Sequence, residues 1–190
     1  PSDMLFVDYL YRWAAENFSI DKSRVYASGQ SSGGMMSWAC ACYRPDIFAA
    51  AAPFSAKILN MEGEALPFIT GSVMPVIASM GLDDNIFPGG FGTDDARMLI
   101  EHWHDAFALR ENWNSYTYND GGKNCSFKSG SAINYLFHSA SGIPILRCVE
   151  METKTHATWP SECRAAWTEF LSHFSKDPCT KKLYYNGKEV

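Results

Sequence analysis

The sequence predicts one α/β domain with a mostly parallel sheet and helices on both of its faces. Short apolar runs typical of strands alternate along the chain with longer amphipathic segments typical of helices. The strand candidates are continuously apolar, as in strands that are covered on both faces. We expect residues 1–176 to form the body of the domain, residues 112–142 to form a lid or clamp, and residues 177–190 to be a polar, loose tail.

Each predicted element has a local reason in the sequence. The helices have one apolar face, and most begin after a residue that can cap their first turn or end before a proline. The strands are rich in small and apolar residues and are separated by polar connections. Helices are expected at about 2–18, 32–42, 93–107 and 160–174, strands at 24–28, 48–54, 75–80 and 143–150, and a hairpin of 115–119 with 132–138.

Composition restricts the class of partner. The chain has 190 residues, of which 46% are hydrophobic, and this length is enough for a sizeable core. Its formal net charge of −5 argues against nucleic acid or an anionic membrane surface as the main partner. The charge is compatible with a neutral or polymeric substrate. No apolar run is long enough to cross a bilayer.

Cysteine usage indicates an extracellular protein. Two of the six cysteines, Cys40 and Cys42, are too close together for a zinc hook, and no matching Cys/His pair follows them. An even number fits a secreted protein with up to three disulfides, and buried free thiols are the alternative. We therefore expect secretion, no metal and no cofactor.

One stretch carries a catalytic motif. Residues 29–33 (GQSSG) match the G-x-S-x-G pattern of a nucleophile elbow, with a strand before and a helix after. Such a turn lifts the Ser31 hydroxyl out of the sheet, and the amide of Ser32 at the start of the helix can face an oxyanion. Side chains at the flanking positions Gly29 and Gly33 are expected to collide with neighbouring elements. The alternative is an ordinary Gly/Ser loop.

Three polar positions are predicted to meet at one edge of the sheet. Ser31, the pair Asp83 and Asp84, and His156 each follow the carboxyl end of a predicted strand, where ligands of open α/β sheets bind. Their order along the chain is that of a Ser-Asp-His triad. His156 is the candidate base for Ser31, and either aspartate can orient its imidazole. It is the one of the five histidines predicted to lie in a loop after a core strand.

Four blocks of sequence carry a family resemblance. They are residues 21–36 (DKSRVYASGQSSGGMM), 45–50 (PDIFAA), 80–88 (MGLDDNIFP) and 156–160 (HATWP). Together they resemble carbohydrate esterase family one, which contains feruloyl and acetylxylan esterases and has polyhydroxybutyrate depolymerases as near relatives. The resemblance implies an α/β-hydrolase fold and chooses Asp84 over Asp83 as the triad acid. Met80 and Thr155 stand where that family has His and Gly.

The resemblance also implies an activity. The expected protein is a secreted serine esterase that hydrolyses feruloyl or other hydroxycinnamoyl esters on plant cell-wall xylan, with Gln30 and Trp159 as candidate substrate contacts. An acetylxylan esterase and a polyester depolymerase are alternatives within this class. A non-catalytic carbohydrate-binding module that kept the fold is an alternative from another class. Trp113, Tyr116, Tyr118 and Tyr135 are the aromatic residues that can form the clamp over the acyl group, and ordinary packing of these side chains is the alternative.

The sequence accounts for only part of an α/β-hydrolase fold. The chain has too few strands for the whole fold, and it lacks the upstream loop that donates the second oxyanion N–H. We expect a missing N-terminal segment of the same hydrolase domain to supply both, as a separate chain or as another part of the gene product. The 190-residue form alone is then expected to aggregate or to be inactive.

Overall fold

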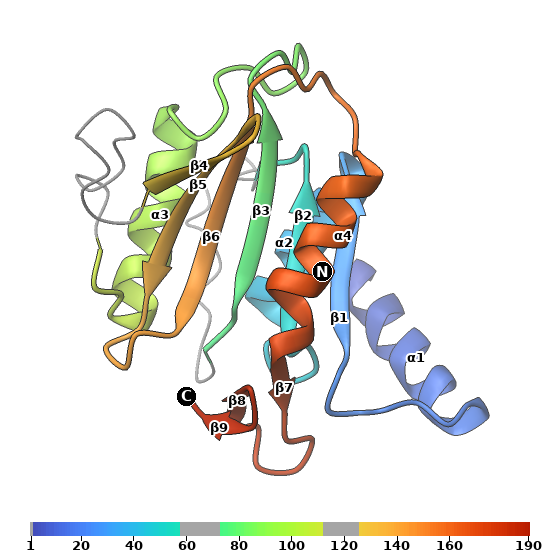
Figure 1. The fold of residues 1–190 in the computed structure, drawn as a ribbon. Helices are drawn as coiled ribbons and strands as arrows, with labels where there is room; N and C mark the ends of the chain where they lie inside the picture. The colour runs from blue at the N-terminus through green and yellow to red at the C-terminus, as the bar shows by residue number, and fades with distance from the viewer. Residues whose placement is uncertain (1, 58–72, 112–125) are drawn as a thin grey trace.

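A six-stranded sheet forms the centre of the computed structural model, which describes residues 2–57, 73–111 and 126–190 (Figure 1). Three neighbouring pairs are parallel, β1–β2, β2–β3 and β3–β6, and β5 is antiparallel to both of its neighbours. This topology confirms the predicted α/β class. The strands in spatial order are β1 (Tyr26–Gln30), β2 (Ala50–Phe54), β3 (Val76–Gly81), β6 (Pro144–Met151), β5 (Ala132–His138) and β4 (Ser126–Ser129).

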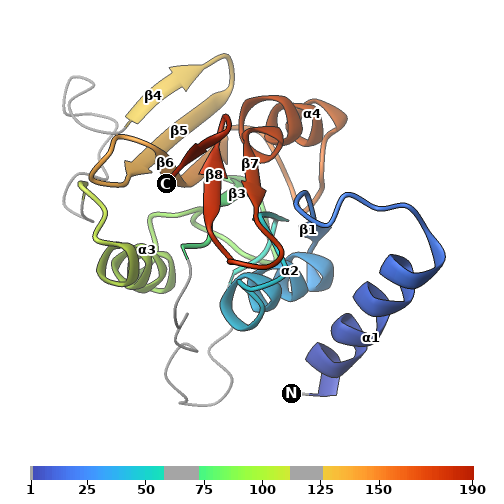
Figure 2. The same cartoon turned by 90° about the horizontal axis from the view of Figure 1, so that it is seen from below.

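Helices cover both faces of the sheet (Figure 2). Helices α2 and α3 lie on one face, where Trp38 and Trp103 pack edge to face in the larger apolar cluster, with ring centroids 5.4 Å apart. Helix α4 lies on the other face (Figure 2), and its residue Ala166 shares the second apolar cluster with Phe170 and Phe174. Within the described residues, no helix is long and apolar enough to cross a membrane. The helices are α1 (Ser2–Asn17), α2 (Ser32–Tyr43), α3 (Asp94–Phe107), α4 (Pro160–Glu169) and the short 3-10 helix η2 (Leu171–His173).

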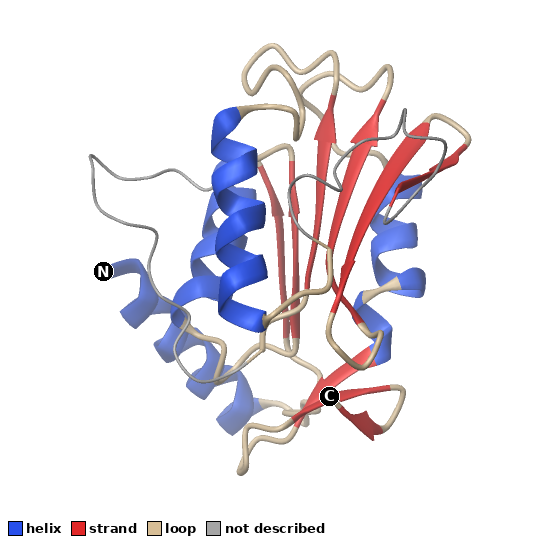
Figure 3. Cartoon of the chain, turned by 90° about the vertical axis from the view of Figure 1, so that its left-hand side faces the viewer, coloured by secondary structure: helices blue, strands red, loops and turns tan. Residues whose placement is uncertain are grey.

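One strand of the predicted hairpin belongs to the main sheet, whose strands are drawn in red in Figure 3. β5 pairs with β4 on one side and with β6 on the other. Residues 115–119, with Trp113, Tyr116 and Tyr118, lie outside the described part of the chain. Tyr135 is buried and donates a hydrogen bond to Glu150. Residues 132–138 are therefore part of the sheet, and the prediction that Tyr135 belongs to a clamp is wrong.

The predicted loose tail is also wrong. Strands β7 (Phe174–Lys176), β8 (Leu183–Tyr185) and β9 (Lys188–Glu189) form a second, antiparallel sheet of three strands. The Asp177 carboxylate accepts amide hydrogen bonds from Cys179 and Thr180 in the first turn. Asn186 and Gly187, both with positive φ, form the second turn, and Asn-Gly is a strong hairpin signal.

Four cysteines in the described part of the chain do not form the expected disulfides. Cys40, Cys42, Cys163 and Cys179 are present as free thiols. Burial raises the pKa of Cys40 to about 11 and that of Cys42 to about 12, so both thiols stay protonated and unreactive at neutral pH. At these two positions the alternative of buried free thiols holds.

Candidate active site

Ser31 occupies a strained turn between β1 and α2. Its backbone has φ 55° and ψ −119°, a region that residues other than glycine rarely adopt. The Ser31 amide donates to the carbonyl of Phe54 at the end of β2, at 3.0 Å, and this bond ties the turn to the neighbouring strand. The hydroxyl does not cap α2, although Ser31 is the N-cap residue. The turn therefore leaves the hydroxyl available to a different partner.

The glycines around Ser31 have unequal roles. A Cβ at Gly29 would lie 2.5 Å from the carbonyl carbon of Gly33, so this position cannot carry a side chain without movement. A Cβ at Gly34 would lie 2.6 Å from that of Ala56. A Cβ at Gly33 would meet no described atom within 4 Å. The predicted collision is correct for Gly29 and wrong for Gly33, and sequence reasoning missed the close packing at Gly34.

The structure brings Ser31, His156 and Asp84 into one hydrogen-bonded chain. His156 Nε2 lies 2.9 Å from Ser31 Oγ. His156 Nδ1 lies 2.9 Å from Asp84 Oδ2 and 3.1 Å from Asp84 Oδ1. A carboxylate can only accept, so Nδ1 carries the proton and Nε2 is left to accept the Ser31 hydroxyl proton. This is the geometry that a general base needs toward a nucleophile.

Asp84 is a buried carboxylate that stays ionised. Only 2% of the residue is exposed. Burial by itself raises its pKa, but hydrogen bonds from the Phe87 amide, His156 and the Ile86 amide outweigh burial and hold the pKa below the ordinary value of 3.8. Asp83 is exposed, and its amide donates to the Lys154 carbonyl at 3.1 Å. Of the two candidate aspartates, the structure places Asp84 against His156.

The loop that carries His156 is held by neighbours that the sequence did not indicate. Ser55, fully buried at the end of β2, donates from Oγ to the Ala157 carbonyl at 2.9 Å. The Phe87 ring lies beside the imidazole, with centroids 5.7 Å apart. The sole sequence signal for Ser55 was its position just after a buried strand. These contacts leave His156 one narrow range of positions.

Gln30 and Trp159, the predicted substrate contacts, have partners within the protein. The Gln30 side-chain amide donates to the His156 carbonyl at 3.3 Å. Trp159 is the N-cap residue of α4 and packs against the second apolar cluster. Contact of either side chain with substrate stays a prediction.

Ser32, the predicted oxyanion donor, lies directly after the candidate nucleophile. Ser32 is the first residue of α2 and is exposed. Amides in the first turn of a helix have no partner within the helix, and they carry its partial positive charge. The role of this amide as an oxyanion donor stays a prediction.

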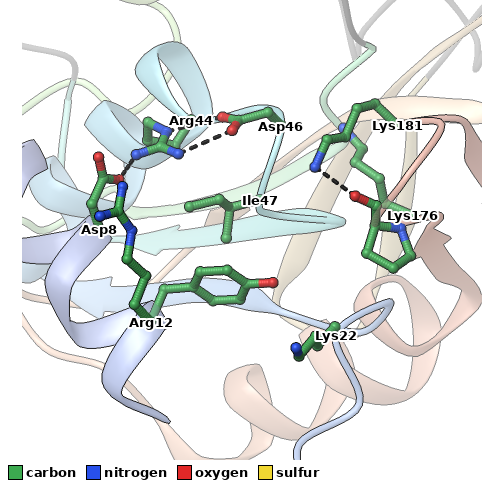
Figure 4. Close-up of a pocket in the computed structure, with 10 residues that line it drawn as sticks. Asp8, Arg12, Lys22, Arg44, Asp46, Ile47, Lys176 and Lys181 are labelled. Atoms are coloured by element: carbon green, nitrogen blue, oxygen red, sulfur yellow. Dashed lines mark hydrogen bonds and ion pairs between the residues drawn. The ribbon is translucent and has the colours of Figure 1, made fainter. Parts of the chain in front are cut away.

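A charged cavity lies at the amino end of the strands, opposite the end that carries Ser31. It has a volume of about 130 Å³ and is lined by Arg12, Arg44, Lys176, Asp8 and Asp46 among others (Figure 4). Arg44 forms ion pairs with both aspartates. None of the three residues of the hydrogen-bonded chain lines this cavity. The hydrogen-bonded chain of Ser31, His156 and Asp84 therefore lies apart from this cavity.

Known proteins resemble the chain in sequence and in fold. The model of the Prolyl oligopeptidase family matches residues 6–68. Poly(3-hydroxyalkanoate) depolymerase C of Paucimonas lemoignei is 27% identical over 156 residues, which cover 75% of this chain and 37% of the relative. A solved structure of acetyl xylan esterase from Aspergillus awamori has a TM-score of 0.60 at 15% identity, covering 86% of this chain and 66% of that one.

The parallel sheet, the strained serine turn and the order Ser, Asp, His along the chain are those of an α/β-hydrolase-like fold, and the solved esterase shares this fold. The chain is similar in fold to acetyl xylan esterase and in sequence to poly(3-hydroxyalkanoate) depolymerase. The match spans a little over a third of the length of the curated depolymerase.

Proposed function

We propose that the protein is a serine ester hydrolase that works through an acyl-enzyme. The observation that carries this proposal is the hydrogen-bonded chain from Ser31 through His156 to Asp84. Ser31 Oγ attacks the ester carbonyl carbon while His156 Nε2 takes its proton. The oxyanion faces the Ser32 amide, and collapse of the intermediate expels the alcohol, which receives the proton from His156. Water then attacks the Ser31 ester by the same route and releases the acid.

The buried carboxylate supports this chemistry. When His156 takes the proton from Ser31, the imidazolium lies 2.9 Å from the ionised Asp84. Asp84 is fixed in place by the Ile86 and Phe87 amides, each 2.9 Å away, so it does not need to reorganise as charge develops.

The proposed substrate class is an ester on an extracellular polymer, with feruloyl esters of plant cell-wall xylan as the first candidate. The motif resemblance supports the feruloyl candidate, whereas the expected clamp has lost Tyr135 to the sheet. The depolymerase relative supports a polyester as the second candidate. Acetylated xylan is the third. Plant cell-wall xylan lies outside the cell, and we therefore also propose that the protein is secreted.

The test compares the parent protein with Ser31→Ala on methyl ferulate, acetylated xylan and polyhydroxybutyrate. We expect hydrolysis of one of these classes by the parent and none by the variant. A fluorophosphonate should label the parent at Ser31 alone. If Ser31→Ala keeps the activity, the nucleophile is another residue. If the parent binds xylan without hydrolysing any ester, the protein is a binding module.

We further propose that a polypeptide segment of the same hydrolase domain completes the sheet beside β1. Within the described residues β1 pairs only with β2, so the strand that leads to Ser31 is at the edge of the sheet (Figure 1). An unpaired edge strand next to apolar surface is open to pairing with another strand. Helix α1 and the residue after it expose large apolar side chains on that side, namely Leu5, Phe6, Tyr9, Leu10, Trp13 and Phe18.

Co-expression with the upstream part of the gene product tests this proposal. The supplied segment should bury the α1 face, remove self-association in light scattering and raise ester hydrolysis by ~10²–10³-fold through a second oxyanion donor. Full activity of residues 1–190 as a monomer, without the added segment, would contradict it.

A further inference from the structure

Lys154 is a fully buried cation close to His156 in the chain. It has an exposed fraction of 0% and forms an ion pair with the carboxylate of Glu162, which is 7% exposed. Lys154 Nζ also lies 3.5 Å from Ser79 Oγ on β3. Neither side chain belongs to the hydrogen-bonded chain of the active site. An ion pair this deep is unusual in proteins and needs a physical reason.

The ion pair closes the loop that holds His156. Glu162 Oε1 binds Lys154, and Glu162 Oε2 accepts the amide of Trp159 at 3.0 Å. One carboxylate therefore joins the start of the loop, at Lys154, to its end, at the first turn of α4. His156 lies between these two points. The loop cannot shift as a unit unless this carboxylate loses a partner.

The backbone of Lys154 joins the same loop to the Asp84 loop. Its carbonyl accepts the amide of Asp83 at 3.1 Å. The two loops are so close that a Cβ at Gly81 would lie 2.0 Å from this carbonyl oxygen. Moving Lys154 therefore moves the loop of Asp84 relative to that of His156, and the His156–Asp84 hydrogen bonds join these two loops.

Net stability is a weak reason for such an ion pair. The desolvation of two buried charges offsets most of their attraction, and uncharged replacements of similar volume are often neutral or stabilising. What the charged pair does provide is a single geometry, because each charge requires the other at hydrogen-bond distance. A displacement of about 1 Å at a catalytic group costs ~10²-fold in rate.

We infer that Lys154 and Glu162 are positioning residues that set His156 against Asp84 and Ser31. The inference deepens the proposed function and rests on it. The ion pair acts through the loop and touches neither substrate nor the reacting atoms.

The decisive variant is Lys154→Met combined with Glu162→Gln. Both replacements keep the side-chain volume, and the new amide oxygen at position 162 can still accept the Trp159 amide, so the melting temperature should stay near that of the parent protein. We expect kcat to fall by ~10–100-fold with KM within about 2-fold, because positioning and not binding is lost. The single variant Glu162→Gln should show a smaller loss in the same direction, and it serves where the double variant does not fold.

Nuclear magnetic resonance of the imidazole protons reports positioning without relying on activity. In the parent, the Nδ1 proton of His156 should give a downfield signal, assigned by its loss in His156→Ala. In the double variant this signal should weaken and exchange faster with water. If the parent hydrolyses no ester, the proposed function fails, and this signal alone decides the positioning inference.

The matched control is Arg147→Met combined with Glu169→Gln. This pair also joins the sheet to α4, with Arg147 Nη2 on β6 2.9 Å from Glu169 Oε2, but it meets the helix at its last residue and not at the end that follows the His156 loop. The control should keep the parent kcat and the Nδ1 signal. A Lys154/Glu162 double variant that also keeps both would overturn the inference, as would equal losses in the control.

Discussion

Buried charged side chains have different partners at the two ends of the main sheet. At the carboxyl end, each buried carboxylate is held by a side chain from another segment, Asp84 by His156 and Glu162 by Lys154. At the amino end, Lys176 is 2% exposed and donates to the carbonyls of Pro45 and Val73. Burial lowers the pKa of Lys176 to about 8. The comparison teaches that the fully buried lysine near the active site is neutralised by a carboxylate, whereas the buried lysine at the amino end is bound by backbone carbonyls, and the ion pairs of Arg44 beside it are partly exposed.

The largest expected effect is at the nucleophile. Ser31→Ala and His156→Ala should each lower kcat by ~10⁴–10⁶-fold, because each removes a member of a unit that acts together. Far-ultraviolet circular dichroism and the melting temperature should stay close to those of the parent protein. Steady-state kinetics on the preferred ester measures the loss. A residual rate above about one hundredth of the parent rate would show that the carboxyl end is not the active site.

The next effect separates the two adjacent aspartates. Asp84→Asn should lower kcat by ~10³–10⁴-fold, because an amide no longer fixes the imidazole tautomer or stabilises the imidazolium. Asp83→Asn is the matched control, since the exposed side chain can change while its amide still donates to Lys154. Its rate should stay within about 2-fold of the parent rate. Equal losses in both variants would contradict the placement of Asp84.

The third effect concerns the amino end. The folded-state pKa of Lys176 is about 8, below its ordinary 10.5, so the unfolded state binds the proton more tightly between these pH values. The free energy of unfolding should therefore rise from pH 8 to pH 10.5, by about 3 kcal/mol from this group. Lys176→Met should lack this rise while keeping the ester hydrolysis rate. Guanidinium unfolding across this pH range measures the difference between parent and variant, and parallel curves would refute it.

The smallest effect compares two adjacent glycines at the carboxyl end. Gly34→Ala should destabilise the protein by ~1–3 kcal/mol, because the new methyl group overlaps Ala56 and the Phe54 carbonyl. Gly33→Ala should be neutral or stabilise by ~0.5–1 kcal/mol, since the position is open and helical. Thermal unfolding of the two variants measures this contrast. A destabilised Gly33→Ala would mean that the position is crowded.

Local signals predicted the parts of the structure that local chemistry builds. The GQSSG turn, the proline that opens α4 and the apolar strands β2 and β3 all lie where the sequence placed them. Ser31, Asp84 and His156 also meet as predicted, because parallel strands bring their carboxyl ends to one edge. The choice of Asp84 over Asp83 depended on the family resemblance, and the structure supports it through hydrogen bonds from Ile86 and Phe87 that no periodicity reveals.

Long-range partners were the part that sequence did not predict. The pairing of β5 with β4 and β6 is chosen among competing strands, and a mainly apolar segment of seven residues fits several of them. The Lys154–Glu162 pair could not be predicted, because the sequence does not distinguish a buried charged residue from an exposed one. The Asn186-Gly187 signal was present and was missed because the surrounding segment is short and polar.

The small second sheet determines where the expressed protein can be shortened at its C-terminal end. Its first strand is fastened to the segment that leads into β1, since Lys176 donates its amide to the Ser23 carbonyl and Tyr26 donates its hydroxyl to the Phe174 carbonyl. Domain boundaries drawn at residue 176, where the polarity rises, would remove β8 and β9 and expose Phe174. Expression boundaries and affinity tags should therefore be placed after Val190, whose amide is itself bonded to Leu183.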